Sequence, residues 1–306
     1  MPKAWAVEKL SADMPLSHGA ALILQVKLPE VMSYEAAARS GDVDGVHDMR
    51  VGAKRLREAA RVLRPALPQT ARKRVLGQVE RLNDALGLVR DRDVLGEAFA
   101  AIRQRQPQTA VLEGLSRQLG SERETHHKAL RKLLRELRAR GFAAFYADVM
   151  REMAQAPPDG QPTVAAFAAE AVSARLADVL ANWAAALTPW DLVSFHRERI
   201  RVKKLKYALE PFVTVLPPEL APIYDQIADL QELMGLVHDC DVQAGVLADW
   251  VGRAGRAPGY SMAEEDIAAR RRKACIELRM LLERMAATGW SAQLGALLDS
   301  FAAVSV

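Results

Sequence analysis

The sequence predicts an all-α protein, built as two four-helix bundles that arose by internal duplication and are related by a pseudo-two-fold axis. Apolar residues recur at helical spacing along most of the 306 residues, and no segment shows the strict alternation of a half-buried strand. The helical pattern of the first half returns, in the same order, in the second half. Half of the residues are apolar, so the chain can bury a large core.

Breaks in the helical pattern divide the chain into two repeats. We expect a flexible N-terminal arm over residues 1–14, a first repeat over 15–156, a linker over 157–162 and a second repeat over 163–306. The linker, PPDGQP, is the strongest turn signal in the chain. The expected helical segments of the first repeat are 15–39, 42–65, 69–103 and 109–153, and those of the second are 163–187, 191–211, 217–250 and 262–288.

Particular residues mark the ends of these segments. Asp42 or Asp44 can cap the helix of segment 42–65, because either carboxylate can accept from the free N–H groups of its first turn. Pro65 and Pro68 end that helix, since proline cannot continue the hydrogen-bond pattern. Gly141 is a natural place for a break in segment 109–153.

Matched sequence blocks carry the evidence for the duplication. LNDALGLVRDRDV, residues 82–94, matches LQELMGLVHDCDV, residues 230–242, at an offset of 148. Segments 42–65 and 191–211 match at an offset of 149, so the register drifts by one residue across a whole half. The same alignment pairs Gly141-Phe142 with Gly289-Trp290, Arg123 with Arg271, and Arg131 with Arg279.

Two of the predicted helices carry a stripe of positive charge. In segment 42–65 the cationic face covers an arc of about 80° and lies opposite the apolar face. Its members are His47, Arg50, Lys54, Arg57 and Arg61, and segment 191–211 repeats them as His196, Arg199, Lys203 and Lys206. A single basic face is usually a solvated surface. Two stripes at matched positions favour a site that holds an anion.

Charge, cysteine content and hydropathy limit the cellular compartment and the kinds of site that we expect for this protein. The chain has 42 basic and 38 acidic side chains, a formal charge of +4, so strong positive potential requires clustering. Cys240 and Cys275 cannot form a disulfide framework and lack the spacing of a zinc site, which favours a reducing compartment. The N-terminus has no apolar signal region and no run of about 18 apolar residues occurs, so we expect a soluble cytoplasmic protein.

These motifs resemble one known family. The paired H-x-x-R-x-x-x-[KR]-[KR]-x-[KR] helices, the G-x-x-[RH]-D-x-D-V segments and the duplicated helical layout are similar to those of the CHAD family, a histidine-bearing α-helical domain associated with inorganic polyphosphate. The resemblance covers about residues 16–301. It implies two helical bundles around a central basic cleft or pore that binds polyphosphate, without catalysis. Fewer than 20 residues precede the first bundle helix, so the chain resembles the stand-alone form.

The predicted site draws residues from both repeats. Polyphosphate offers only oxygens, which suit the planar donor fork of arginine and the mobile charge of lysine. The residues expected to bind polyphosphate are His47, Arg50, Lys54, Arg57, Arg90, Arg131, His196, Arg199, Lys203, Lys206, Tyr207, His238 and Arg279. Asp91, Asp93, Asp239 and Asp241 are expected to form supporting ion pairs that orient Arg50 and Arg199.

The same residues leave two alternatives. The Asp-x-Asp pairs also suit a metal ion, and His47-Asp48 and His238-Asp239 resemble the HD pairs of all-helical metal-dependent phosphohydrolases. The position matched to His238 holds Arg90, and the one matched to Asp48 holds Arg197. What the repeat preserves is therefore positive charge rather than metal ligands.

A nucleic-acid-binding module is the second alternative, since any basic groove attracts a phosphate backbone. Aromatic residues make up only 6% of the chain, and Tyr207 is the one aromatic residue beside the stripes, which argues against base stacking. The sequence thus predicts a non-catalytic polyphosphate-binding protein with no cofactor, no metal, no specific nucleic acid and no membrane association. Polyphosphate granules or polyphosphate enzymes are its expected surroundings.

Overall fold

Helices account for nearly all of the structured chain. The computed structural model describes residues 4–105, 111–183, 191–255 and 259–303. Within these ranges the chain forms no strand, and a single isolated bridge pairs Pro15 with Thr163. None of the helices described there is long and apolar enough to cross a membrane. The predicted all-α class is confirmed.

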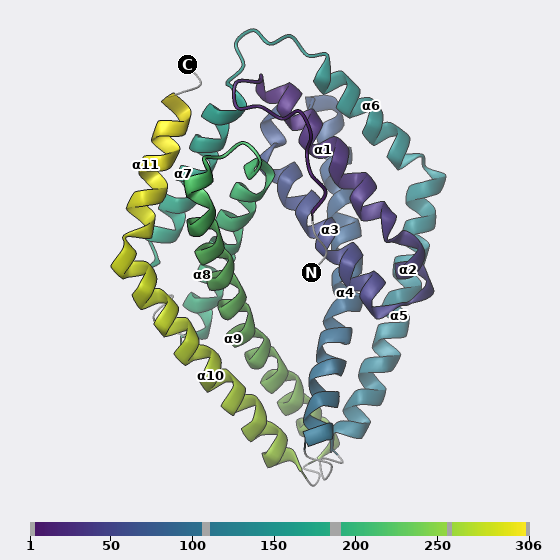
Figure 1. The fold of residues 1–306 in the computed structure, drawn as a ribbon. Coiled ribbons are helices and arrows are strands. Elements are labelled where there is room, and N and C mark those ends of the chain that lie inside the picture. The colour runs from purple at the N-terminus through teal and green to yellow at the C-terminus, as the bar shows by residue number, and fades with distance from the viewer. Residues whose placement is uncertain (1–3, 106–110, 184–190, 256–258, 304–306) are drawn as a thin grey trace.

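The order of the helices follows the breaks read from the sequence (Figure 1). The first half contains α1 (Leu16–Ser33), α2 (Glu35–Ser40), α3 (Val43–Val62), the 3₁₀ turn η1 (Arg64–Ala66), α4 (Gln69–Arg105), α5 (Val111–Ala139) and α6 (Phe142–Ala154). The second half contains α7 (Val164–Leu180), α8 (Leu192–Leu209), the 3₁₀ turns η3 (Glu210–Phe212) and η4 (Pro218–Leu220), α9 (Ala221–Ala254), α10 (Tyr260–Thr288) and α11 (Trp290–Ala303). Residues 109–110, which begin one expected segment, and 184–187, which end another, lie outside the described residues.

Two glycines separate consecutive helices: the break predicted at Gly141 is confirmed, whereas the helix that follows Gly289 was not predicted. Gly141 separates α5 from α6 with φ 61°, and Gly289 separates α10 from α11 with φ 63°. Residues with a Cβ rarely adopt this left-handed conformation, so glycine is the residue that permits the sharp turn. Four helices per half was therefore too low a number for the described chain. The internal duplication and its two-fold axis stay predictions.

One end of the molecule joins the two halves through backbone hydrogen bonds. The N–H of Leu16 donates to the carbonyl of Pro162 at 2.9 Å, and the N–H of Val164 donates to the carbonyl of Met14 at 2.8 Å. The N–H of Ala165 donates to the carbonyl of Ala12 at 2.9 Å. These bonds satisfy free donors in the first turns of α1 and α7. Residues 12–14 of the predicted arm are thus attached to the second half, while residues 1–3 lie outside the described chain.

The opposite end joins the halves through a separate small core. There α4 and α5 converge on α9 and α10 (Figure 1), and the core between them includes Phe99, Leu112, Leu247 and Ile267. An ion pair between Arg105 and Asp266, 2.9 Å apart, spans the same junction. A second, larger core runs through both halves.

Between these ends, α3 packs against α8. Each helix starts at an aspartate cap: Asp42 accepts from the N–H of Gly45 at 2.6 Å, and Asp191 accepts from the N–H of Ser194 at 3.1 Å. The apolar residues on their core-facing sides, including Met49 on α3 and Leu205 on α8, are almost fully buried. Because the apolar faces are committed to the core, the cationic faces are left at the junction of the two halves.

Candidate functional site

Five cations from α3 and α8 form the centre of the candidate site. They are Arg50 and Lys54 on α3 and Arg199, Lys203 and Lys206 on α8, and we call them the cation cluster. Lys54 feels the charges of all four others. Its Nζ lies 5.6 Å from the ring centroid of Tyr207, and the Nζ of Lys206 lies 5.8 Å from the same centroid. The two stripes therefore meet across the junction.

Neutral amides hold two of these cations. Arg50 donates through Nη1 to the backbone carbonyl of Asn83 at 2.7 Å and to the side-chain oxygen of the same residue. Lys206 donates to Oε1 of Gln231 at 3.3 Å. An amide oxygen orients a cation without cancelling its charge. Asn83 and Gln231 occupy matched positions of the two sequence blocks.

No carboxylate of the described chain lies within ion-pair distance of the cation cluster. The Nε of Arg199 is buried and has no hydrogen-bond partner among the described residues. A buried donor without a partner costs free energy, on the order of 1–3 kcal/mol. The five positive charges are therefore not compensated by direct ion pairs among the described residues.

The pKa values of the cluster also show that its positive charges lack compensating negative charge. Burial, and then the neighbouring cations Lys203 and Arg50, lower the pKa of Lys54 from 10.5 to about 7. Burial, followed by Arg199 and Arg57, lowers the pKa of Lys203 to about 8. Burial also lowers the pKa of Arg50, but guanidinium stays charged in proteins. An anion placed here would reverse these shifts by favouring the charged forms.

Other arginines of the predicted stripes and site already have carboxylate partners that offset their charge. Arg57 donates through Nε to Glu58 at 2.9 Å, and Arg61 pairs with Glu80 at 2.9 Å. Arg90 pairs with Glu97, seven residues further along α4, at 3.1 Å. Of these arginines, Arg57 lies near enough to act on the charges of Arg50 and Lys203.

The three predicted histidines lie close to the cluster and carry lowered pKa values. The rings of His196 and His238 face each other across α8 and α9 with their centroids 4.8 Å apart. Burial, and then Arg199 and His196, lower the pKa of His238 to about 4. Burial and Arg90 lower the pKa of His47. In the free protein the imidazoles are therefore mainly neutral near pH 7.

Two of the four aspartates expected to form supporting ion pairs do so, but with other arginines than expected. Asp93 pairs with Arg123, and Asp241 pairs with Arg271 at 2.6 Å. The expectation that these two aspartates orient Arg50 and Arg199 was wrong, because each faces the neighbouring long helix, α5 or α10. The Nη2 of Arg123 also donates to the carbonyl of Gly41 at 2.9 Å, which ties α5 to the turn before α3.

Asp91 and Asp239 come nearer to their expected role. The charge of Asp91 acts on Arg50, and the charge of Asp239 acts on Arg199. Neither pair is within ion-pair distance, so the carboxylates attract the guanidinium groups without binding them. Burial raises the pKa of Asp239, Arg199 opposes that rise, and Asp91 on the opposite half adds to it.

Arg131 and Arg279, which occupy matched positions of the repeat, have different environments in the structure. Arg131 on α5 is half-buried, and its Nε has no hydrogen-bond partner among the described residues. The side chain of Arg279 on α10 is 80% exposed and pairs with Glu283 at 3.0 Å. The structure thus leaves Arg279 on the surface rather than in the cluster, which corrects its assignment to the site.

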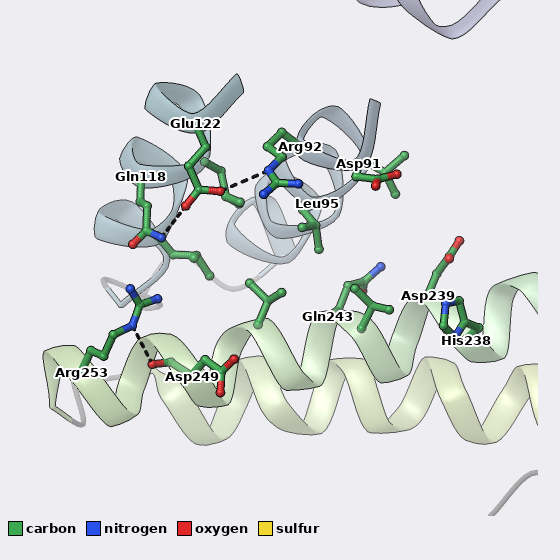
Figure 2. A pocket seen from close by; sticks show the side chains of 15 residues that line it. Asp91, Arg92, Leu95, Gln118, Glu122, His238, Asp239, Gln243, Asp249 and Arg253 are labelled. Atoms are coloured by element: carbon green, nitrogen blue, oxygen red, sulfur yellow. Dashed lines mark hydrogen bonds and ion pairs between the residues drawn. The ribbon is translucent and has the colours of Figure 1, made fainter. Parts of the chain in front are cut away.

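A pocket of about 470 Å³ lies between α4, α5 and α9, next to His238. Figure 2 shows Asp91 and Asp239 on its two sides, with the ion pair of Arg92 and Glu122, 3.1 Å apart, further along. The lining contains more carboxylates than guanidinium groups. The expected central opening is therefore not uniformly basic, since positive charge gathers between α3 and α8 and acidic side chains line this pocket.

Comparison with known proteins places the fold. The model of the CHAD domain matches residues 23–248. The chain belongs to the CHAD domain family. Among solved structures, a CHAD domain from the plant Ricinus communis superposes with a TM-score of 0.71 and 24% identity, covering 92% of this chain and 96% of that one.

A second solved structure shares the fold of this CHAD domain. PptA from Streptomyces chartreusis superposes with a TM-score of 0.62 and 18% identity, covering 89% of this chain and 99% of that one. The comparison with curated proteins gave no significant match. At these identities the two structures establish the fold alone.

The sequence analysis did not identify the two amides, Asn83 and Gln231, that contact the cation cluster. Asn83 and Gln231 were part of the matched blocks, and the recurrence of an amide at one position of the repeat was a usable signal. Among the described residues of this CHAD domain, no three His, Cys, Asp or Glu side chains come together as metal ligands. The HD pairs thus lack a third ligand of these types there.

Proposed function

We propose that this CHAD domain binds inorganic polyphosphate at the cation cluster and does so without catalysis. One observation carries the proposal: five cations from two helices converge with neutral amides and an aromatic ring as their only direct partners in the described chain. Burial and mutual repulsion destabilise their charged forms. A polyanion removes that cost, which is the physical source of the affinity.

The chemistry of the cluster suits phosphate oxygens in a chain. Arg50 and Arg199 offer planar donor forks, while Lys54, Lys203 and Lys206 offer mobile point charges. Successive cations on one helix face are separated by about 5 Å, one helical turn, which lets them contact neighbouring phosphates. His196 and His238 border this path, and a bound phosphate would raise their pKa values by favouring imidazolium.

The surroundings of Tyr207 favour polyphosphate over single-stranded nucleic acid. The side chain is 8% exposed, and two lysine ammonium groups flank its ring. A base therefore finds no free aromatic face for stacking beside the cluster. The association of the CHAD family with polyphosphate supports the same ligand. We place the protein in the cytoplasm, bound to polyphosphate granules or to polyphosphate enzymes.

Calorimetric titration with long-chain polyphosphate tests the proposal. The double variant Arg50→Glu/Arg199→Glu should lose binding by at least about 100-fold, because it reverses two central charges. Arg151→Glu/Arg272→Glu is the matched control, since it changes the net charge equally but replaces exposed arginines that already have carboxylate partners. Circular dichroism verifies that both variants fold.

Two results would count against the proposal. If the reversed variant binds as tightly as the control, the cluster is not the site. Single-stranded DNA of equal total charge provides the second comparison. Equal affinity for DNA and polyphosphate would reduce the activity to general attraction of polyanions.

A further inference from the structure

The pocket between α4, α5 and α9 adjoins the cation cluster. His238 lines the pocket, and its ring centroid lies 4.8 Å from that of His196 on α8. Asp239 also lines the pocket, and its charge acts on Arg199 of the cluster. The pocket and the cluster are therefore neighbours, and a single ligand can occupy both.

The pocket has the size and the walls of a small-molecule site. Its volume of about 470 Å³ falls within the range of about 300–1,000 Å³ that is usual for such sites. Leu95 on α4 faces α9 (Figure 2), and Val242 and Val246 on α9 and Leu119 on α5 add to an apolar lining. Flat bases pack well between apolar side chains. The walls thus accept a planar heterocycle without an aromatic partner.

A buried amide on α9 presents a donor to this space. Gln243 is 5% exposed, and its Oε1 accepts from Nη2 of Arg270 at 2.7 Å. Asp266 holds this arginine in turn, since it accepts from Nε at 2.9 Å. The amide nitrogen of Gln243 has no hydrogen-bond partner among the described residues, and Figure 2 shows it directed from α9 towards α4. Because Oε1 is occupied, the pocket receives an N–H donor on a fixed side chain.

The wall formed by α5 presents an acceptor in the same way. Gln118 donates through Nε2 to Oε1 of Glu122 at 2.6 Å, and Nε of Arg92 donates to Oε2 of the same carboxylate at 3.1 Å. The amide nitrogen of Gln118 is thereby used within the protein, and its Oε1 is available to accept from a ligand. A donor and an acceptor on oriented side chains are what recognition of a nucleobase edge requires.

Charge decides which part of a ligand enters the pocket. Asp91 and Asp239 stand on its two sides at the end nearest His238 (Figure 2). Carboxylates repel phosphate groups, whereas they accept hydrogen bonds from the hydroxyl groups of a ribose. A neutral nucleoside is therefore favoured in the pocket, and phosphates are favoured among the cations.

We propose that this CHAD domain binds nucleoside oligophosphates, the class to which ATP belongs. The base lies between the apolar walls, where Gln118 and Gln243 contact its edge. The ribose hydroxyls donate to Asp91 and Asp239, and the phosphates contact Arg199 and the other members of the cation cluster. Because its phosphates use that cluster, the nucleoside site rests on the proposed function and adds to it a ligand with a part that is not phosphate.

Calorimetric titration with ATP and with tripolyphosphate tests the nucleoside site. Both ligands carry three linked phosphates, only ATP carries a base and a sugar, and EDTA keeps metal ions out of both titrations. Val242→Phe should weaken ATP binding at least about 10-fold, because the larger side chain fills the pocket, and should change tripolyphosphate binding less than about 2-fold. Val242 is 40% exposed, so the variant should fold, which circular dichroism checks. The control Val213→Phe adds the same side chain at an exposed position outside the pocket and should change neither affinity.

Asp239→Ala provides a second test. Loss of this carboxylate should strengthen tripolyphosphate binding, because a negative charge near Arg199 disappears. ATP gains the same benefit but loses a hydrogen bond to its ribose. The ratio of the ATP affinity to the tripolyphosphate affinity should therefore fall about 10-fold. An unchanged ratio would exclude this carboxylate from contact with the nucleoside.

Other outcomes would also overturn the inference. Equal effects of Val242→Phe on both ligands, or no effect on either, would place the nucleoside outside the pocket. Putrescine, an alkyl diamine, probes the alternative that the carboxylates hold an organic cation. If Asp239→Ala abolishes putrescine binding while ATP binding is insensitive to Val242→Phe, the pocket holds organic cations instead.

Long-chain polyphosphate, titrated under the same conditions, separates the two proposals. If it binds the wild type and ATP does not, only the nucleoside site is refuted. Failure of both ligands to bind would remove the proposed function as well.

Discussion

Polyphosphate binding should weaken strongly as the pH rises through neutrality. In the free protein the pKa of Lys54 is about 7 and that of Lys203 about 8, and a bound polyanion returns both towards their ordinary range. Binding above these pKa values therefore takes up protons. Between about pH 6.5 and pH 8.5 we expect a loss of about 25-fold from Lys54 and about 4-fold from Lys203, or about 100-fold in total.

A variant that stays positively charged over this pH range distinguishes the titration of Lys54 from other effects of pH on binding. Arginine stays protonated throughout this range, so Lys54→Arg should reduce the dependence to the about 4-fold contribution of Lys203. The assay is titration with long-chain polyphosphate at constant ionic strength, since long chains minimise the titration of terminal phosphates. Wild-type binding that is flat over this range, or an unchanged slope in Lys54→Arg, would refute the reasoning.

Four further predictions concern single positions. Asn83→Leu should weaken polyphosphate binding about 5-fold, because the guanidinium that the amide orients loses its acceptor; calorimetry measures this, and unchanged affinity would exclude an orienting role. Arg123→Met should lower the free energy of unfolding by about 3–5 kcal/mol in urea titrations, since it leaves the buried carboxylate of Asp93 unpaired. Lys54→Met should raise the melting temperature of the free protein more at pH 6.5 than at pH 9.5. Because the pKa of Lys54 is about 7 in the folded protein, the folded state must bury a charged ammonium below that pH, and this destabilises the wild type fully. Above about pH 7 the folded state releases the proton, so the destabilisation becomes smaller as the pH rises. Arg279→Glu should change affinity less than about 2-fold because this side chain lies outside the cluster, whereas a large loss would return it to the site.

Features set by local sequence were predicted best. The cap at Asp42 depends on residues within one turn, and the structure shows its carboxylate accepting from Gly45. The break at Gly141 follows from the conformations open to glycine. The matching break at Gly289 was visible as part of a repeat, but the helix that follows it was not separated, because no proline or polar loop announces the turn.

Features set by packing between helices were predicted less well. The sequence placed Asp93 on a helix, but which helix packs beside it is a tertiary property, and its partner is Arg123 rather than Arg50. The difference in ion pairing between Arg131 and Arg279 follows from their local sequence. Four residues after Arg279 stands Glu283, which pairs with it, whereas Arg135 stands at the same distance from Arg131.

The state of the cation cluster also depended on the fold. Sequence indicated which residues are cationic, but burial and the approach of α8 to α3 set the pKa values of Lys54 and Lys203. The separation of charge along the junction, with cations between α3 and α8 and carboxylates in the pocket beside His238, was likewise not visible. Net charge and composition average over such differences.

A crystal structure of the protein grown with long-chain polyphosphate would test the central claim most directly. The account predicts a chain of phosphates between α3 and α8, with oxygens in contact with Arg50, Lys54, Arg199 and Lys203. Phosphate bound only at exposed arginines such as Arg279, with the cation cluster left without an anion, would contradict it.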